Sequence, residues 1–555
     1  MLLVSHKDRV ILKRLSFIVL VATAFAGLKL IFLNKLFTPI APNDELLIKE
    51  FSALTLANSR FLDLLLYGNP VLPFIGTGLL KLNKYNFSLI WSYGTTFFYS
   101  FLPLMVFTKN VQKKLSIDDH YSWIIYLVII FSPYNLFTHL FMVEILIWFM
   151  ALLILFYCEP PKTIRSKFIW TIILLFLVST KALGYSFLLS FFAVYIALPA
   201  IKALSIRRTN IVHALMVFLV ITAFLVLKNY LLGIYGSKDQ IFGAPLYRPI
   251  FKKMLDPNLY LKEIGFVSKY FFGHAAYIFW LYGGLIWITW DNFKTKSLEE
   301  NHTSLFFFLN TLILLGFTIL FSTTISVMFG EGESNRIHSR YYFFSLVPFL
   351  LTGINRKPAS EIYNKTQLMF VSLIVASSTF YCGFFLKVDF KALSLIDNHD
   401  LLWFMNPQWY LNDFNKEIFK DYNPFFTALV LLWGGVQLLL LWKLDKSKSK
   451  TTLGWSIVIF FLLINAINYK IYRNNSKGLN KQFSACIKKA SARLEEKDLS
   501  AINIVTNDWN DFLRIKYALI SGSHPSITHT KDYVRTKKTL NVIFQRPKYC
   551  EILSF

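Results

Sequence analysis

Cysteine is scarce in this chain, with only four among 555 residues. Cys158 and Cys382 fall inside long apolar segments, where they are expected to pack or to face lipid. Cys486 and Cys550 lie in the polar C-terminal region and can form a disulfide if that region is in an oxidising compartment. This scarcity excludes a disulfide-rich scaffold, and no Cys/His spacing typical of a metal site is present.

Motifs that mark many soluble enzymes are missing as well. The sequence has no glycine-rich phosphate-binding loop, no serine nucleophile elbow and no tandem repeat. We therefore expect no nucleotide cofactor. The sequence leaves open whether a divalent cation is bound.

Charge is low and mostly of one sign. Charged residues make up 16% of the chain, and 58 basic residues against 32 acidic ones give a net charge of +26. By contrast, 55% of the residues are hydrophobic and 17% are aromatic, and the mean hydropathy is +0.48. This composition indicates a multispanning membrane protein rather than a soluble globule.

Long apolar runs predict the membrane spans. A helix needs about 20 apolar residues to cross a bilayer, and the hydropathy pattern predicts about thirteen such helices. The first follows a basic N-terminal segment and is predicted to be an uncleaved signal anchor. The expected fold is therefore an all-α polytopic membrane protein, with spans near 15–34, 87–107, 121–137, 141–158, 168–180, 183–201, 211–228, 270–290, 304–328, 341–354, 367–386, 425–442 and 453–470.

The loops between these spans differ in charge. Those on one side are short and basic, whereas those at 35–86, 229–269 and 387–424 are long and mix both signs. Because Lys and Arg collect on the cytoplasmic side, the N-terminus is predicted to be cytoplasmic, and an odd number of spans places the C-terminus outside. The positive charge is thus mainly topological, with some of it available to anionic lipids, and no nucleic-acid partner is expected.

Two regions outside the spans carry structural signals. In the first outer loop, apolar residues recur near helical spacing before Gly68-Asn69-Pro70, which predicts one or two interfacial helices. Residues 1–470 would form the transmembrane domain. Residues 471–555 turn polar, with a helical stretch around Lys481–Glu496 and a strand-like Ala501–Val505, and predict a small extracytoplasmic α/β domain.

An acidic pair, Asp44 and Glu45, comes directly after the first span. A carboxylate at the membrane surface can ionise at little cost and can act as a general base on a hydroxyl. The alternative is structural, with Asn43 or Asp44 as a helix N-cap and Glu45 favouring the helix dipole. Spacing alone does not decide between the two.

Basic residues on the same predicted face are candidates for binding an anion. Lys181 interrupts an apolar stretch at the outer turn between the fifth and sixth spans, and Arg336, His338 and Arg340 precede Tyr341 at the start of the tenth. Guanidinium groups bind phosphate oxygens bidentately. The alternatives are a snorkelling lysine and an ordinary interfacial belt of aromatics and cations.

A second acidic position lies near the outer start of the fourth span. Glu144 follows His139 there, and the two could join Asp44 in holding an acceptor or a divalent cation. A polar pair satisfied within the protein is the alternative.

The order of these motifs resembles the C-type (GT-C) glycosyltransferases, integral membrane enzymes that use polyprenyl-phosphate-linked sugars. The family includes aminoarabinose-lipid A transferases and protein O-mannosyltransferases. The resemblance covers roughly residues 10–355 and rests on Pro42–Glu45, Tyr67–Pro70, Ser132-Pro133 before Glu144, the Thr180-Lys181 turn, and Ser339–Tyr342 leading to Pro348.

This resemblance implies an inverting single displacement that moves a hexosyl or pentosyl group to a lipid, glycan or protein hydroxyl outside the cytoplasm. The implied setting is the cell envelope, with lipopolysaccharide among the acceptors of the family. A bias toward Lys, Asn, Ile and Phe indicates an AT-rich genome, and we expect a bacterial inner membrane. Asp44 would be the general base and Glu45 would orient the acceptor or a metal. The implied donor-phosphate ligands are Lys181, Arg336, His338, Arg340 and Tyr341.

Other functions remain open at this point. An O-antigen ligase or polymerase normally relies on a large later outer loop, whereas here the first outer loop is the more structured. A lipid-linked glycan transporter or flippase is expected to carry charged or broken helices near mid-membrane, often in two related halves. Neither feature is visible, since most ionisable residues lie at span ends. A non-catalytic scaffold is a further alternative, and the sequence does not identify the sugar, the acceptor or the oligomeric state.

Overall fold

The structure is a computed structural model. It describes residues 16–17, 19–27, 49, 52–53, 71–82, 87–115, 117–132, 135, 138, 142–158, 161, 163–181, 183–197, 212–213, 215–224, 226, 250, 252–294, 298–329, 337–354, 365–386, 424–443, 448, 450–463, 465, 486, 489–490, 492, 501–506, 515–516, 519, 526–530, 539–545 and 549–554.

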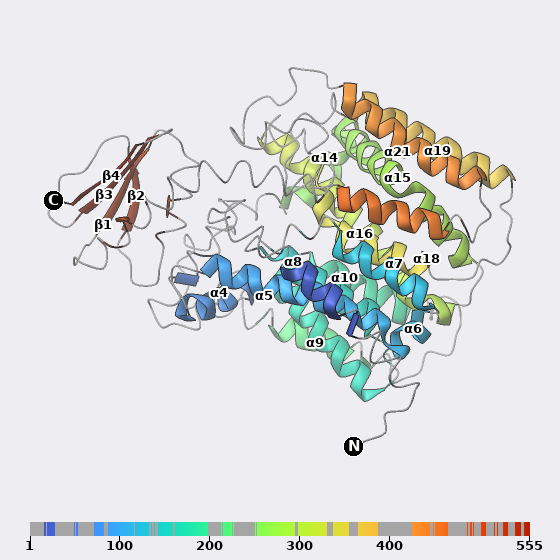
Figure 1. The fold of residues 1–555 in the computed structure, drawn as a ribbon, viewed down its shortest axis with the longest axis horizontal. Helices are drawn as coiled ribbons and strands as arrows, with labels where there is room; N and C mark the ends of the chain where they lie inside the picture. The colour runs from blue at the N-terminus through green and yellow to red at the C-terminus, as the bar shows by residue number, and fades with distance from the viewer. Residues whose placement is uncertain are drawn as a thin grey trace. The chain divides into compact units, whose positions relative to one another are not determined.

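Most of the described chain is helical (Figure 1). The helices follow the predicted spans closely: the one expected at 304–328, for example, lies within the longer helix Leu298–Phe329. The helical elements are α4 (Val71–Leu82), α5 (Phe87–Phe101), η1 (Leu102–Phe107), α6 (Lys109–Leu115), α7 (Asp119–Ile130), α8 (Glu144–Phe156), α9 (Ile164–Thr180), α10 (Gly184–Phe192), η3 (Ala193–Ala197), α14 (Pro257–Lys262), α15 (Ile264–Lys294), α16 (Leu298–Phe329), η4 (Ser339–Tyr341), α18 (Phe343–Ile354), α19 (Lys365–Phe384) and α21 (Pro424–Lys443).

Within the described residues, three helical segments are long and apolar enough to cross a membrane: Ile264–Trp290, His302–Met328 and Lys365–Phe384. Shorter apolar helices occupy Asp119–Ile130, Glu144–Phe156, Gly184–Tyr195, Leu215–Phe224, Phe343–Gly353, Thr427–Lys443 and Lys450–Leu463. This set of helices is that of a multi-pass membrane protein. The count of thirteen spans stays a prediction.

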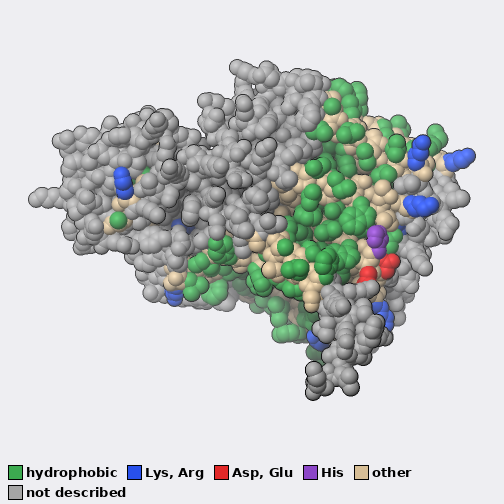
Figure 2. All heavy atoms as spheres, viewed as in Figure 1, with side chains coloured by type: hydrophobic (Ala, Val, Ile, Leu, Met, Phe, Trp, Pro, Cys, Tyr) green, Lys and Arg blue, Asp and Glu red, His purple; other side chains and the backbone are tan. Residues whose placement is uncertain are grey.

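The surface of these helices is apolar where it is not packed. On α19, Met369, Phe370 and Leu373 are each more than 60% exposed. Figure 2 shows the same for one face of the molecule, where described charged side chains lie mostly toward the edges of an apolar surface. A patch of this kind would be a liability in water, but it is the expected surface against lipid tails.

The chain forms two compact units. One comprises residues 1–102, 135–146 and 469–555, and the other comprises residues 103–134 and 147–468. In the second unit α15 packs against α16, α18, α19 and α21, and α10 packs against α9 and α16.

Small residues bring the helices of this unit close together. A side chain at Gly434 of α21 would collide with Thr379 of α19, and one at Gly353 of α18 would collide with Thr289 of α15. Between α15 and α21, the Gln437 amide accepts from the Gly284 N–H at 3.1 Å and donates to the Trp280 carbonyl at 2.5 Å. Close packing and interhelical hydrogen bonds of about 0.6 kcal/mol each stabilise helix pairs in lipid.

Asn310 of α16 ties together the helices next to the candidate site. Its Nδ2 donates to Ser345 Oγ of α18 at 3.0 Å, and Ser190 Oγ of α10 donates to its Oδ1 at 3.4 Å. Ser345 Oγ in turn donates to the Phe307 carbonyl of α16 at 3.0 Å. The start of α18 is therefore fixed against α16 by buried polar contacts.

Contacts within the second unit join like ends of the predicted spans. Predicted outer ends meet in the pairs Phe131 with Asn465, Lys181 with Tyr341, and Tyr270 with Ser326. Predicted inner ends meet in the pairs Tyr121 with Thr451, Lys114 with Cys158, and Arg165 with Tyr157. The helices thus alternate in direction, as consecutive spans must.

Four strands form one mixed sheet near the C-terminus: β1 (Ala501–Val505), β2 (Ser526–Thr530), β3 (Thr539–Gln545) and β4 (Tyr549–Ser554). The order is β2-β1-β3-β4, with β1 parallel to β2 and β3, and β3 antiparallel to β4. The strand predicted at Ala501–Val505 is confirmed. The domain boundary at residue 470 stays a prediction.

The cysteines divide as the sequence suggested. Cys158 and Cys382 are free and buried, whereas Cys486 is disulfide-bonded. The fourth and last cysteine of the chain is Cys550.

Candidate functional site

Two cations meet on one tyrosine at the predicted outer end of the second unit. Lys181 Nζ lies 5.2 Å from the centroid of the Tyr341 ring, and Arg340 Cζ lies 4.9 Å from it. Arg340 Nη2 also donates to the Tyr341 hydroxyl at 3.1 Å. All three side chains are half-buried. We call Lys181, His338, Arg340 and Tyr341 the cationic cluster.

His338, the N-cap of the short helix η4, completes this cluster. Its imidazole is buried and stacks on Tyr341, with ring centroids 5.6 Å apart and an interplanar angle of 18°. Phe321 of α16 approaches the same tyrosine edge-on at 6.2 Å. Tyr341 is thus the aromatic centre around which the cations are arranged.

The local sequence explains why Lys181 lies there. It is the C-cap of α9, where a positive charge interacts favourably with the helix dipole. Gly184 N donates to the Lys181 carbonyl at 2.8 Å, which closes the turn into α10. A side chain at Gly184 would collide with the Leu177 backbone, so this turn requires glycine.

The cluster offers hydrogen-bond donors that suit an anion. Lys181 carries an ammonium group and Arg340 a guanidinium group, and both lie on the same tyrosine ring. A phosphate oxygen placed between them would accept charge-assisted hydrogen bonds from both. Lys181, His338 and Arg340 all contact Tyr341, whereas their binding of phosphate stays a prediction.

Glu144 belongs to the other compact unit. It is the first residue of α8 and is fully buried, in a position where the helix dipole favours a carboxylate. Nearby in the chain, Thr138 and Asn135 are also buried, and Thr95 Oγ1 donates to the Thr138 carbonyl at 2.6 Å. The pairing with His139 is not tested, since His139 lies outside the described residues.

Three other predicted site residues, Asp44, Glu45 and Arg336, also lie outside the described residues. Their roles stay predictions. Among the residues that the structure describes, no group of three His, Cys, Asp or Glu side chains could hold a metal ion.

Lys49 is a buried cation that the sequence did not single out. It lies five residues after Asp44 and is only 2% exposed, and burial lowers the pKa of Lys49 to about 7. One turn later, the Ser52 carbonyl accepts a hydrogen bond of 3.2 Å from Thr77 of α4. The sequence did not show that Lys49 is buried, because the spacing of this segment resembles an ordinary interfacial helix.

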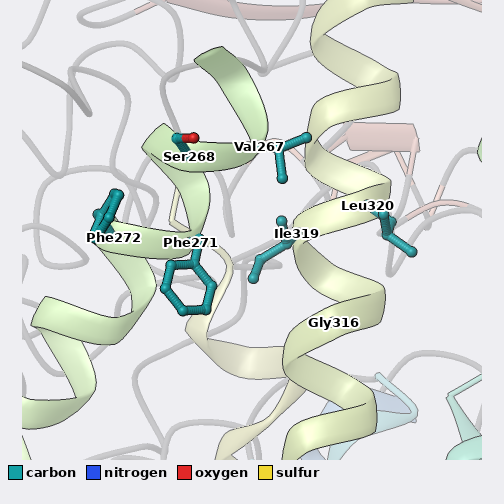
Figure 3. A pocket seen from close by; sticks show the side chains of 7 residues that line it. All are labelled: Val267, Ser268, Phe271, Phe272, Gly316, Ile319 and Leu320. Carbon is teal, nitrogen blue, oxygen red and sulfur yellow. The ribbon is translucent and has the colours of Figure 1, made fainter. Parts of the chain in front are cut away.

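An apolar groove runs between α15 and α16 (Figure 3). It has a volume of about 480 Å³, within the range of ligand pockets, and its lining includes Phe271, Gly316 and Ile319. Val267 and Ile319 project between the two helices, and Gly316 leaves open space opposite. Leu320 lines the groove while the next residue, Phe321, contacts Tyr341. The groove and the cationic cluster therefore lie on different faces of α16, contacted by consecutive residues.

Comparison with known proteins gives little further information. No known family model matches the chain, and no curated protein matches it. A solved structure with some similarity is the crystal structure of ArnT from Cupriavidus metallidurans in the apo state, at 11% identity over 94% of this chain and 86% of that one, with a TM-score of 0.43. This score is too low to establish a common fold, so the function is argued from the residues themselves.

Proposed function

We propose that this protein is a membrane glycosyltransferase that moves a sugar from a polyprenyl-phosphate donor to a hydroxyl on the non-cytoplasmic face. The cationic cluster carries this proposal. Lys181 and Arg340 come from parts of the sequence far apart, yet both lie on Tyr341 at the end of the helices that is predicted to be outer. A lipid phosphate is an anion found at the headgroup level, which is where the outer ends of membrane spans lie.

The proposed reaction is a single displacement. The acceptor O–H loses its proton to the Asp44 carboxylate, and its oxygen forms a bond to the anomeric carbon. The bond from that carbon to the donor phosphate breaks, and the electron pair leaves with the polyprenyl phosphate. Lys181 and Arg340 neutralise the charge that develops on the phosphate. Glu45 and Glu144 are proposed to orient the acceptor or a divalent cation.

The proposed location is a bacterial inner membrane, with the N-terminus in the cytoplasm and the C-terminus outside. The disulfide at Cys486 supports this orientation, because disulfides persist in oxidising compartments and are rare in the cytoplasm. A lipid-linked donor presented on the outer side also requires no nucleotide at the site.

The groove between α15 and α16 is proposed to hold the apolar tail of the donor. A Cβ added at Gly316 meets nothing within 4 Å, so Gly316→Leu places a side chain into open space of the groove. We expect this variant to raise the KM for a long-chain donor about tenfold while kcat is kept, because the tail loses apolar contact. The measurement is the initial rate against the concentration of a long-chain polyprenyl-phosphate sugar.

Gly435→Leu is the matched control. Gly435 of α21 is also exposed and has open space around its Cα, but it does not line the groove. The control is expected to behave as wild type. A change in acceptor KM rather than donor KM in Gly316→Leu would assign the groove to the acceptor instead.

The function as a whole is tested by the envelope of a strain that lacks the gene. We expect one sugar to be missing from a lipid, glycan or protein, and to be restored by wild type but not by the Lys181→Gln variant. An unchanged glycan and lipid profile would contradict the proposal.

A further inference from the structure

A buried histidine contacts the residue that follows Tyr341 of the cationic cluster. His274 of α15 is fully buried, and its Nδ1 lies 3.0 Å from the hydroxyl of Tyr342. The two rings meet edge-on, with centroids 5.5 Å apart. Tyr342 is itself fully buried and follows Tyr341 in the chain. The aromatic centre of the cluster and this contact therefore belong to consecutive residues.

The second nitrogen of His274 is left unsatisfied. Within the described part of the chain, Nε2 is buried and has no hydrogen-bond partner. An imidazole in this state is a poor choice for packing alone, because an apolar ring would fill the same space without an orphaned polar atom. The contact with Tyr342 is the feature that an apolar ring would not supply.

Neighbouring residues hold the imidazole in place. Tyr270, one turn earlier on α15, stacks on His274 at 6.4 Å, and its hydroxyl lies 2.7 Å from Ser326 Oγ of α16. His338 is close enough to His274 for the two groups to interact electrostatically. The histidine is thus anchored by α15 and α16 and directed at the turn that carries the cluster.

Tyr342 joins the turn that carries the cluster, η4, to the helix α18. It is the C-cap of η4, its N–H donates to the Ser339 carbonyl at 3.3 Å, and its own carbonyl accepts from Leu346 N at 2.9 Å in the first turn of α18. A shift of the Tyr342 backbone would therefore move Arg340 and Tyr341 with it.

We propose that His274 is a positioning residue that fixes Tyr342, and through it holds Arg340 and Tyr341 in the geometry that binds the donor phosphate. This inference rests on the proposed function. His274 does not touch the donor itself, so its loss affects donor binding by allowing the turn to move.

The test compares His274→Phe, His274→Asn and Tyr342→Phe. Phenylalanine keeps an aromatic ring but removes the hydrogen bond, and we expect the donor KM to rise about five- to tenfold in either Phe variant, with kcat unchanged. The double Phe variant should be no worse than either single one, because both remove the same interaction. Asparagine places an amide near the position of Nδ1 and should restore most of the donor affinity.

Tyr126→Phe is the control, since Tyr126 of α7 is another buried tyrosine and its hydroxyl has no hydrogen-bond partner among the described residues. An unchanged donor KM in both Phe variants overturns the inference, and so does a loss of stability with no change in KM. If His274→Phe does not fold, Tyr342→Phe decides alone, because it removes only one oxygen. If wild type transfers the sugar and these variants do so with unchanged donor KM, this inference is overturned and the proposed function stands. If wild type is inactive, both are overturned.

Discussion

Replacing Lys181 or Arg340 by glutamine is expected to raise the KM for the polyprenyl-phosphate donor about 10- to 100-fold. Each substitution removes a charge-assisted hydrogen bond to phosphate, which contributes about 1.5–3 kcal/mol, and about 1.4 kcal/mol corresponds to a factor of ten. Because both cations lie on Tyr341, their effects should not add fully in the double variant. Initial rates of purified protein against donor concentration provide the measurement.

Arg165→Gln is the matched control for these substitutions. Arg165 Cζ also lies over a tyrosine ring, at 5.9 Å from the centroid of Tyr157, and its Nη2 donates to that tyrosine's hydroxyl. This pair lies at the predicted cytoplasmic end, where no donor phosphate binds. Its donor KM should equal that of wild type. If all three variants share wild-type donor kinetics, the cationic cluster is only an interfacial belt.

Asp44→Asn is expected to lower kcat by about 10²- to 10⁴-fold, the contribution of a general base. The substitution keeps the size of the side chain and its capacity to cap a helix, so expression and membrane insertion should be unchanged. The measurement is single-turnover transfer from a polyprenyl-phosphate sugar at saturating donor. This outcome also distinguishes a role of Asp44 as general base from a role as helix N-cap, because asparagine is equally suited to an N-cap.

Asp63→Asn serves as the control for Asp44→Asn, since Asp63 is an acidic residue of the same outer loop. It should retain full activity. Wild-type turnover by Asp44→Asn would remove the catalytic assignment and leave Asp44 with a capping role.

The sequence indicated where the helices lie because hydropathy depends on length and composition, which do not require knowledge of packing. The helix at Leu298–Phe329 and the strand at Ala501–Val505 illustrate this. Lys181 and Arg340 could also be assigned to one face in advance, since each is a cation at the end of an apolar stretch and topology places both ends on the same side. Their common contact with Tyr341 is the structural result.

The partners inside the bundle could not be predicted in the same way. Helices such as α9 and α16 are apolar almost all round, so periodicity does not reveal which face packs. His274 therefore read as a single polar residue in a span, and nothing in the sequence joined it to Tyr342, 68 residues away. The groove at Gly316 arises from the gap between two helices, which a single sequence does not reveal. The burial of Lys49 could not be predicted for the same reason.

Direct sugar transfer tests the central claim, that the cationic cluster binds the phosphate of a lipid-linked sugar donor. Purified wild-type protein in lipid would be mixed with polyprenyl-phosphate sugars and an extract of envelope acceptors, and release of polyprenyl phosphate would be followed alongside the Lys181→Gln and Arg165→Gln variants. We expect release by wild type and Arg165→Gln, and a large loss of release in Lys181→Gln at limiting donor. Absence of release by wild type, or equal release by Lys181→Gln, would contradict the claim.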